Sequence, residues 1–179
     1  FCLCVMGAPI QAQAQHRADT LNEDNITEFL QDISDQTSGN GLESSPDSIK
    51  TFLQRHLHKN ARFKSKMEYN IPGQPTQQKS MSLDKQQFIN NTGAGSNALD
   101  GYESEVEIVD IRLSGDKTKA TVKTNGFESG YIEVDDGNGY MAEVPMNGIS
   151  SCTQIIMLND NHVIQLYHAN CETTINFEN

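Results

Sequence analysis

The sequence has little positive charge: its 179 residues include 13 Lys and Arg against 24 Asp and Glu, a formal net charge of −11. Non-specific nucleic-acid binding depends on neutralising phosphate groups, so this composition argues against a nucleic-acid partner. The chain also lacks the Cys/His spacing of a zinc site and the Gly-x-Ser-x-Gly motif of a nucleophile elbow. These absences remove the most easily identified site chemistries.

Two further patterns fall short of a metal site. His56 and His58 are two residues apart in an expected helix, which points them to different faces, whereas paired helical ligands prefer a spacing of four. Asp136-x-Asn138-Gly139 resembles a fragment of a calcium loop, but the distal Glu and the flanking helices are missing. We therefore expect neither a metal nor another cofactor.

Residues 1–15 are uncharged, apolar at the front and rich in small residues behind. They resemble the end of a secretory signal peptide with an Ala-x-Ala site at Ala12–Ala14, and the apolar run is too short to span a bilayer as it stands. Removing this segment, with Cys2 and Cys4, would leave two cysteines and no membrane attachment, which suits an exported protein of the periplasm or the medium. The alternative is an N-terminus that is disordered or packs in the core.

The remaining chain, residues 20–178, has the length of a single domain and opens with two expected helices. The first covers Asn22–Gln36, where apolar residues recur at helical spacing. The second has Ser45 as its N-cap, Pro46 at its first position and Asn60 as its stop. Their apolar stripes are Ile26, Phe29, Leu30 and Ile33, and then Ile49, Phe52, Leu53 and Leu57.

After the second helix the apolar period changes from 3.6 to 2, which indicates strands. The first runs over Arg62–Ile71 and ends at Pro72–Pro75, and a short helix follows over Leu83–Asn91 with Ser82 as its cap. The later expected strands are Tyr102–Leu113, Thr118–Val134, Met141–Leu158 and His162–Phe177.

The last two strands are expected to form a hairpin around Asn159–Asn161. Apolar residues occupy both faces of this ribbon, as the adjacent pairs Ile155-Ile156 and Val163-Ile164 show. A strand with one face in water should alternate between apolar and polar residues. We therefore expect helices on one face of the ribbon and a second subunit on the other.

The same hairpin contains Cys152 and Cys171. A symmetric turn would place Cys152 opposite His168, about three residues from Cys171, so a longer loop or a bulge near Gly148 or Asn170 would be needed to bring the sulfurs together. Such a disulfide would stabilise the fold by roughly 3 kcal/mol. We expect the bond to form; the alternative is two unrelated buried thiols.

Charge is distributed unevenly along the sequence. Basic residues gather in one segment and acidic residues in another, which suggests solvated faces that complement each other within the fold or in a dimer. The alternative is a basic rim that attracts an anionic ligand. The two groups are Lys50, Arg55, Lys59, Arg62, Lys64 and Lys66, and Glu103, Glu105, Glu107, Asp110, Asp135 and Asp136.

Two helices, a strand, a short helix and then long antiparallel strands form an α+β order. Over most of residues 20–178 this order resembles the nuclear transport factor 2-like superfamily, with its polyketide-cyclase-like (SnoaL-like) and ketosteroid-isomerase-like members. The likeness depends on Ile26–Ile33, Ile49–Leu57, Ala61–Tyr69 and Ser82–Asn91. It implies N-terminal helices packed in the concavity of a strongly bent antiparallel sheet, a pocket inside this cone, and a homodimer formed through the outer sheet face.

The function that we expect is a non-enzymatic exported domain that binds a small, largely apolar ligand in the cone or acts as a dimeric interaction module. One alternative is a metal-independent enzyme of the polyketide-cyclase or isomerase kind, with a pocket Asp or His as general base. The other is a periplasmic secretion-system assembly component.

The enzyme alternative has four weak catalytic candidates. Asp110 lies within an apolar strand and His168 near the end of the last one, while Tyr69 and Tyr131 could project into the cone. None aligns with a catalytic motif of the superfamily. The competing interpretation is a solvent-facing Asp and a hydrogen-bonded His without a catalytic role.

Overall fold

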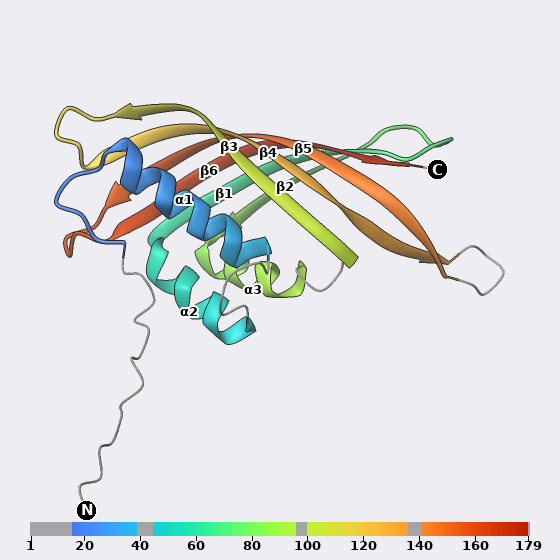
Figure 1. The fold of residues 1–179 in the computed structure, drawn as a ribbon, viewed down its shortest axis with the longest axis horizontal. Helices are drawn as coiled ribbons and strands as arrows, with labels where there is room; N and C mark the ends of the chain where they lie inside the picture. The colour runs from blue at the N-terminus through green and yellow to red at the C-terminus, as the bar shows by residue number, and fades with distance from the viewer. Residues whose placement is uncertain (1–15, 39–44, 96–99, 136–140, 179) are drawn as a thin grey trace, which may run out of the picture.

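The computed structural model describes residues 16–38, 45–95, 100–135 and 141–178, which form a six-stranded sheet with three helices against one face (Figure 1). The segment expected to be a signal peptide, residues 1–15, lies outside this description. The helices are α1 (Glu23–Ser38), α2 (Pro46–His56) and α3 (Lys85–Gly95). The strands are β1 (Leu57–Asn70), β2 (Gln77–Asp84), β3 (Asp100–Leu113), β4 (Lys119–Asp135), β5 (Met141–Leu158) and β6 (Ile164–Phe177).

The strands lie in the order β2-β1-β6-β5-β4-β3. Every neighbouring pair is antiparallel except β1 and β6, which run parallel. The bent α+β sheet with helices in its concavity is confirmed, but the expectation of a purely antiparallel sheet was wrong at this pair. The error has a physical reason: β1 and β6 are far apart in the sequence, and no turn between them sets their direction.

The first two helices begin where the sequence signals place them. Asn22 and Asn25 exchange backbone-to-side-chain hydrogen bonds of 2.9 and 3.0 Å at the start of α1. The Ser45 hydroxyl accepts a bond from the Ser48 amide at the start of α2, and Pro46 occupies the first turn. These side chains satisfy amides that the first helical turn leaves without partners, so both starts could be predicted locally.

The segment between β1 and β3 differs from the expectation. Residues Gln77–Asp84 form strand β2, which pairs with β1, instead of leading directly into a helix. The cap of α3 is Asp84, not Ser82, because Asp84 and Gln87 each bond the other's backbone amide at 2.9 Å. The strand is polar and mostly exposed, so it lacks the apolar alternation by which a strand is predicted.

Helix α2 ends at His56, before the expected stop at Asn60, because Leu57 already belongs to β1. Lys85, at the start of α3, donates hydrogen bonds from Nζ to the carbonyl oxygens of Gln54 and Leu57, each at 2.6 Å. Desolvation lowers the pKa of Lys85. This one side chain therefore joins α3 to the carbonyl end of α2.

The core lies between the helices and the inner face of the sheet. Leu21, just before α1, packs with the apolar stripes of α1 and α2 against alternate residues of β1, β4, β5 and β6. The sheet side of this core consists of Ala61, Phe63, Ala120, Val122, Ile156, Ile164 and Leu166. All the described helices lie on this face, so the inner and outer faces of the sheet have different surroundings.

The outer face of the hairpin is not covered as expected. The turn at Asn159–Asn161 is present, but Ile149 is 53% exposed and Tyr167 38% exposed on the outer side of β5 and β6. No described segment of the chain packs over them. The apolar residues on both sides of the ribbon are thus buried on the helical side and open on the other.

The ordered fold begins slightly before the expected boundary at residue 20. Residues 16–18 pair with the start of β6 through the bonds from Ile164 N to His16 O, at 2.9 Å, and from Ala18 N to His162 O, at 3.0 Å. The His16 ring is buried, and its Nε2 lies 2.7 Å from Asp32 Oδ2 on α1. This contact connects the N-terminal segment to the first helix.

His56 is buried beside this contact, with 1% of its surface exposed. Its ring lies 5.4 Å from that of His16 and 4.6 Å from that of Phe52. Its Nδ1 is 3.1 Å from the Ile164 carbonyl oxygen, an acceptor, so this nitrogen carries the proton. Burial is the main influence and lowers the pKa of His56 from 6.5 to about 4; His16 and Arg55 act in the same direction.

We predict that acid weakens the fold through His56. The unfolded chain binds a proton at this ring more tightly than the folded chain does, so stability falls as the pH decreases from about 6.5 to 4, by about 3 kcal/mol in total. Urea unfolding of the wild type and of His56→Gln at several pH values measures this loss. The variant should lose much less unfolding free energy between pH 6.5 and 4, and equal losses would contradict the assignment.

Candidate functional site

The best-formed hollow on the inner side lies between α1 and the strands β3, β4 and β5. Its volume is about 280 Å³. Leu30, Ile33 and Val106 supply apolar walls, and Ser34, Thr37, Ser104, Glu128 and Gln154 supply polar groups. We call this hollow the α1 pocket. It has the mixture of apolar surface and few polar groups that small-molecule sites share.

A glycine in β4 leaves the space that forms the floor of the α1 pocket. Gly126 lines the pocket, and a Cβ there would meet the Ser150 Cβ at 3.5 Å and nothing closer. A side chain would therefore fit without a clash and would fill part of the hollow. Gly148 on β5 has a related role, because a Cβ there would lie 3.5 Å from the Glu128 Cβ. Its absence lets Glu128 lie flat along β5.

The polar groups of the pocket come from β4 and β5. Gln154 donates from Nε2 to the Thr124 hydroxyl at 3.0 Å, which satisfies one of the few buried polar side chains. An ionised Glu128 carboxylate can only accept hydrogen bonds. The pocket is thus suited to a ligand that has an apolar body and a hydroxyl or amino donor.

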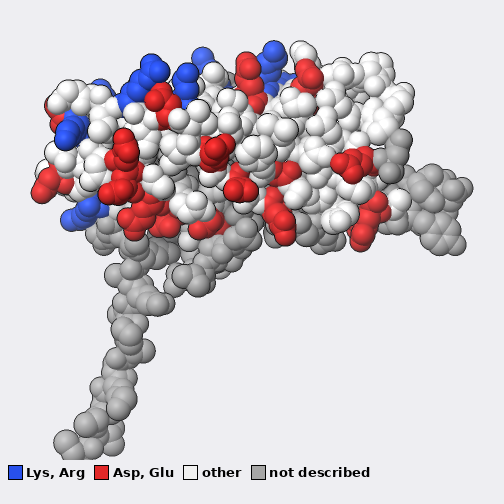
Figure 2. All heavy atoms as spheres, turned by 45° about the horizontal axis from the view of Figure 1, so that its top comes forward, with Lys and Arg blue, Asp and Glu red and all other residues white. Residues whose placement is uncertain are grey.

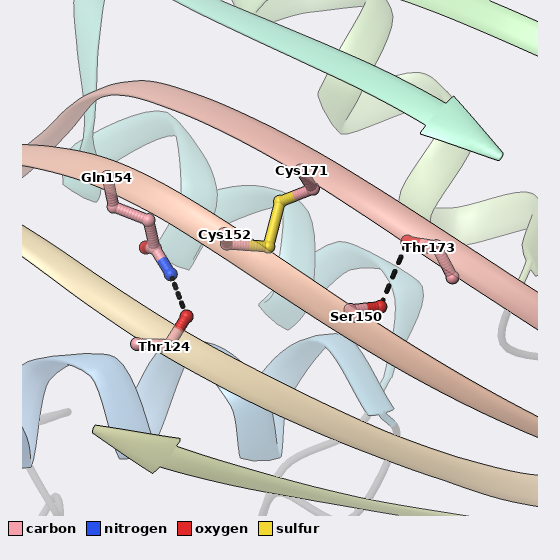
Figure 3. Close-up of a disulfide and its surroundings, with 6 residues drawn as sticks. All are labelled: Thr124, Ser150, Cys152, Gln154, Cys171 and Thr173. Atoms are coloured by element: carbon pink, nitrogen blue, oxygen red, sulfur yellow. Dashed lines mark hydrogen bonds between the residues drawn. A yellow bond between two sulfur atoms is a disulfide. The ribbon is translucent and has the colours of Figure 1, made fainter. Parts of the chain in front are cut away.

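A disulfide joins the two strands beside the pocket (Figure 3). Cys152 on β5 and Cys171 on β6 are direct partners across the strands, with Cα atoms 4.1 Å apart and sulfurs 2.05 Å apart. Gln154 reaches Thr124 on one side of this bond, and on the other the hydroxyls of Ser150 and Thr173 lie 2.9 Å apart. The bond therefore fixes β5 against β6 next to the pocket wall.

The shift in register that aligns the cysteines does not occur where the sequence suggested. The loop from Asn159 to Val163 is longer than the simple turn, and the register shifts again between Ile155 and Ile156. Ile156 pairs with Leu166 and Ile155 with His168, so Tyr167 is the extra residue of a bulge. The expected slip at Gly148 or Asn170 was wrong, because both residues lie in regular pairing.

The four catalytic candidates do not meet in the α1 pocket. Asp110 pairs with Lys123 in the sheet and lies 2.8 Å from Arg112 in an exposed ion pair. His168 lies between Arg62 and Ile155 across the strands. The Tyr69 hydroxyl contacts Met67 Sδ at 3.3 Å, and Tyr131 is 45% exposed. None of the four belongs to the described lining of the pocket.

The described residues contain no group of three or more His, Cys, Asp or Glu that could hold a metal ion. Among the helices that the structure describes, none is long and apolar enough to span a membrane. The calcium-like fragment Asp136–Gly139 lies outside the described residues.

Sequence reasoning missed the residues that form the pocket. Gly126, Glu128 and Gln154 lie on three turns of alternation along two strands and have no motif spacing in the sequence. The one available signal was the glycine inside a strand, since such a glycine often marks the close approach of a ligand or of another backbone. Its meaning depends on α1 lying opposite, which the sequence does not show.

Scans of family models and of curated proteins found no match. Solved structures do share the architecture. A conserved protein from Planctomyces limnophilus has 9% identity and a TM-score of 0.55, covering 84% of this chain and 97% of its own. A putative scytalone dehydratase from Novosphingobium aromaticivorans has 10% identity, a TM-score of 0.51 and coverages of 83% and 81%. A nuclear transport factor 2-like superfamily protein from Salmonella enterica has 11% identity, a TM-score of 0.50 and coverages of 83% and 87%.

We predict that the disulfide contributes about 3 kcal/mol to the free energy of unfolding, because it closes a loop with a sequence separation of 19 residues. The double variant Cys152→Ala/Cys171→Ala should lose about that amount in urea unfolding. The wild type in reductant should lose a similar amount, whereas the double variant should not respond to reductant. A wild type whose stability is the same with and without reductant would contradict the prediction.

Proposed function

Because the chain has the nuclear transport factor 2-like fold, we propose that it is an exported domain that binds a small molecule in the α1 pocket. The observation that carries the proposal is the glycine-floored hollow between α1 and the sheet. The disulfide supports the exported location, since such bonds persist in oxidising compartments.

The lining defines the chemical class of the ligand. Leu30, Ile33 and Val106 favour an apolar body, and a pocket of about 280 Å³ limits it to a small one. Glu128 favours a neutral or cationic donor over a carboxylate, since two like charges repel at close range. The ligand that fits is therefore a small apolar amine or alcohol.

Binding, without a chemical step, is the function that this lining supports best. General acid–base catalysis needs a positioned group within hydrogen-bond reach of the reacting proton. The described lining holds no histidine, tyrosine or aspartate, and the catalytic candidates lie elsewhere. Its polar groups can orient a ligand and select among ligands.

The test uses three probes with the same aromatic body: 2-phenylethylamine, 2-phenylethanol and phenylacetate. We predict that the amine and the alcohol shift the amide NMR signals of Ser104, Gly126 and Gln154 with dissociation constants of about 1 mM, typical of fragments of this size. Phenylacetate should bind at least about tenfold more weakly, because of Glu128.

Gly126→Ala supplies the matched variant, because its methyl group fills the floor without a clash. It should weaken binding of the amine roughly five- to tenfold, the cost of one overpacked methyl group. Gly115→Ala, in an exposed turn with open space around it, should leave binding unchanged. The proposal fails if no probe shifts these signals, or if both alanine variants bind like the wild type.

A further inference from the structure

The outer face of the sheet carries two rows of opposite charge. On β1, Arg62, Lys64 and Lys66 are exposed and alternate with the inward Ala61 and Phe63. On β3, at the other side of the sheet, the outward residues are Glu103, Glu105 and Glu107. We call these the basic row and the acidic row. In Figure 2 most basic side chains gather along the upper edge, and acidic ones spread across the face below it.

The two rows cannot neutralise each other within one copy of the chain. Strands β6, β5 and β4 lie between β1 and β3, which separates the rows by about 19 Å at the usual strand spacing. Within the described residues, neither Lys64 nor Lys66 has a carboxylate within 4.0 Å, and the ion pair on this face joins Asp110 and Arg112. Each row is therefore a line of like charges, which repel one another.

The strands between the rows present short side chains and a few exposed apolar ones. Ile149 on β5 and Phe127 on β4 are neighbours across the strands and are 53% and 44% exposed. Ile149 lies in a shallow depression of about 480 Å³ whose rim includes Lys66 and Glu172. The middle of the face can thus approach another surface closely, with its charges kept to the two sides.

We propose that a second copy of this chain covers the outer face, with β1 of each copy over β3 of the other. A two-fold axis running along β5, the central strand of the five from β1 to β3, produces this arrangement. The basic row of each copy then faces the acidic row of its partner, on both sides of the axis. Ile149 of one copy lies near Ile149 of the other.

The charge rows also select this orientation over its alternative. A two-fold axis across the strands would place β1 over β1 and β3 over β3, which sets each row against its own kind. Like charges brought together in an interface cost several kcal/mol. The face can therefore pair with itself in the orientation that lays the strands of the two copies side by side in the same direction.

The footprint indicates a weak association. From strand spacing and rise, the face between the rows covers about 500 Å² per copy, against about 800 Å² in a standard interface. Its centre is polar, and the net charge of −11 makes two copies repel at long range. The expected dissociation constant is about 10–100 μM in 0.1 M salt, measurable by sedimentation equilibrium.

Charge reversal tests the orientation. Lys64→Glu/Lys66→Glu should raise the dissociation constant at least tenfold, because the acidic row of the partner then faces an acidic row. Glu105→Lys/Glu107→Lys should also raise it at least tenfold, although it lowers the net charge from −11 to −7. General repulsion predicts the opposite sign for this second variant. Combining all four substitutions restores complementarity and should return the dissociation constant to within about threefold of the wild type.

Lys50→Glu/Lys79→Glu is the matched control, since it changes the net charge as Lys64→Glu/Lys66→Glu does, at exposed residues of α2 and β2 that lie off the outer face. It should change the dissociation constant less than threefold. Circular dichroism and urea unfolding confirm that each variant is folded. The proposal is overturned by a monomeric wild type at 200 μM, by reversal variants that associate like the wild type, or by a fourfold variant that stays weak.

Discussion

The burial of one face of the sheet under α1 and α2 is the contact on which the rest of the structure depends. Leu21, Ile26, Phe29, Leu53 and Leu57 are fully buried against inward residues such as Val122 and Ile156. Because successive side chains of a strand point to opposite faces, this burial decides the direction of every other residue on the same strands. The polar floor of the α1 pocket and the charge rows are consequences of it.

Bulges adjust this alternation locally. One between Ile155 and Ile156 moves β6 by one residue relative to β5, so that Ile156 pairs with Leu166 while Cys152 meets Cys171. Both the apolar packing at the turn and the disulfide beyond it need this shift. A ribbon in uniform register could satisfy one of them and not the other, because a slip of one residue sends a side chain to the opposite face.

Local signals in the sequence predicted the parts of the fold that local chemistry determines. Ser45 and Pro46 mark the start of α2 because their own atoms satisfy and shape its first turn. The parallel pairing of β1 with β6 has no such signal, and the polar strand β2 is held by its neighbour instead of by its own apolar face. The α1 pocket was beyond prediction for the same reason: Gly126 gains its meaning only when Leu30 and Ile33 lie across from it.

The apolar residues on both sides of the β5–β6 ribbon were a correct observation whose cause the single chain does not fully supply. Ile156 and Leu166 are buried by helices, whereas Ile149 and Tyr167 remain open on the other face. Exposed apolar side chains set among unneutralised charges are costly to leave in water only when they are contiguous, and here they are scattered. The rows of charge, more than apolar area, therefore provide the specificity for a second copy.

Strand β3 shows why the two proposals are independent although they share residues of one strand. Ser104 and Val106 face the α1 pocket, and Glu103 and Glu107, one position away, face outward. A substitution at an outward position changes the charge that a partner meets while the inner wall keeps its side chains. Gly126 lies between the outward Asn125 and Phe127 in the same way. Alternation within the strands therefore lets one sheet carry a ligand site and an interaction surface whose failures can be told apart.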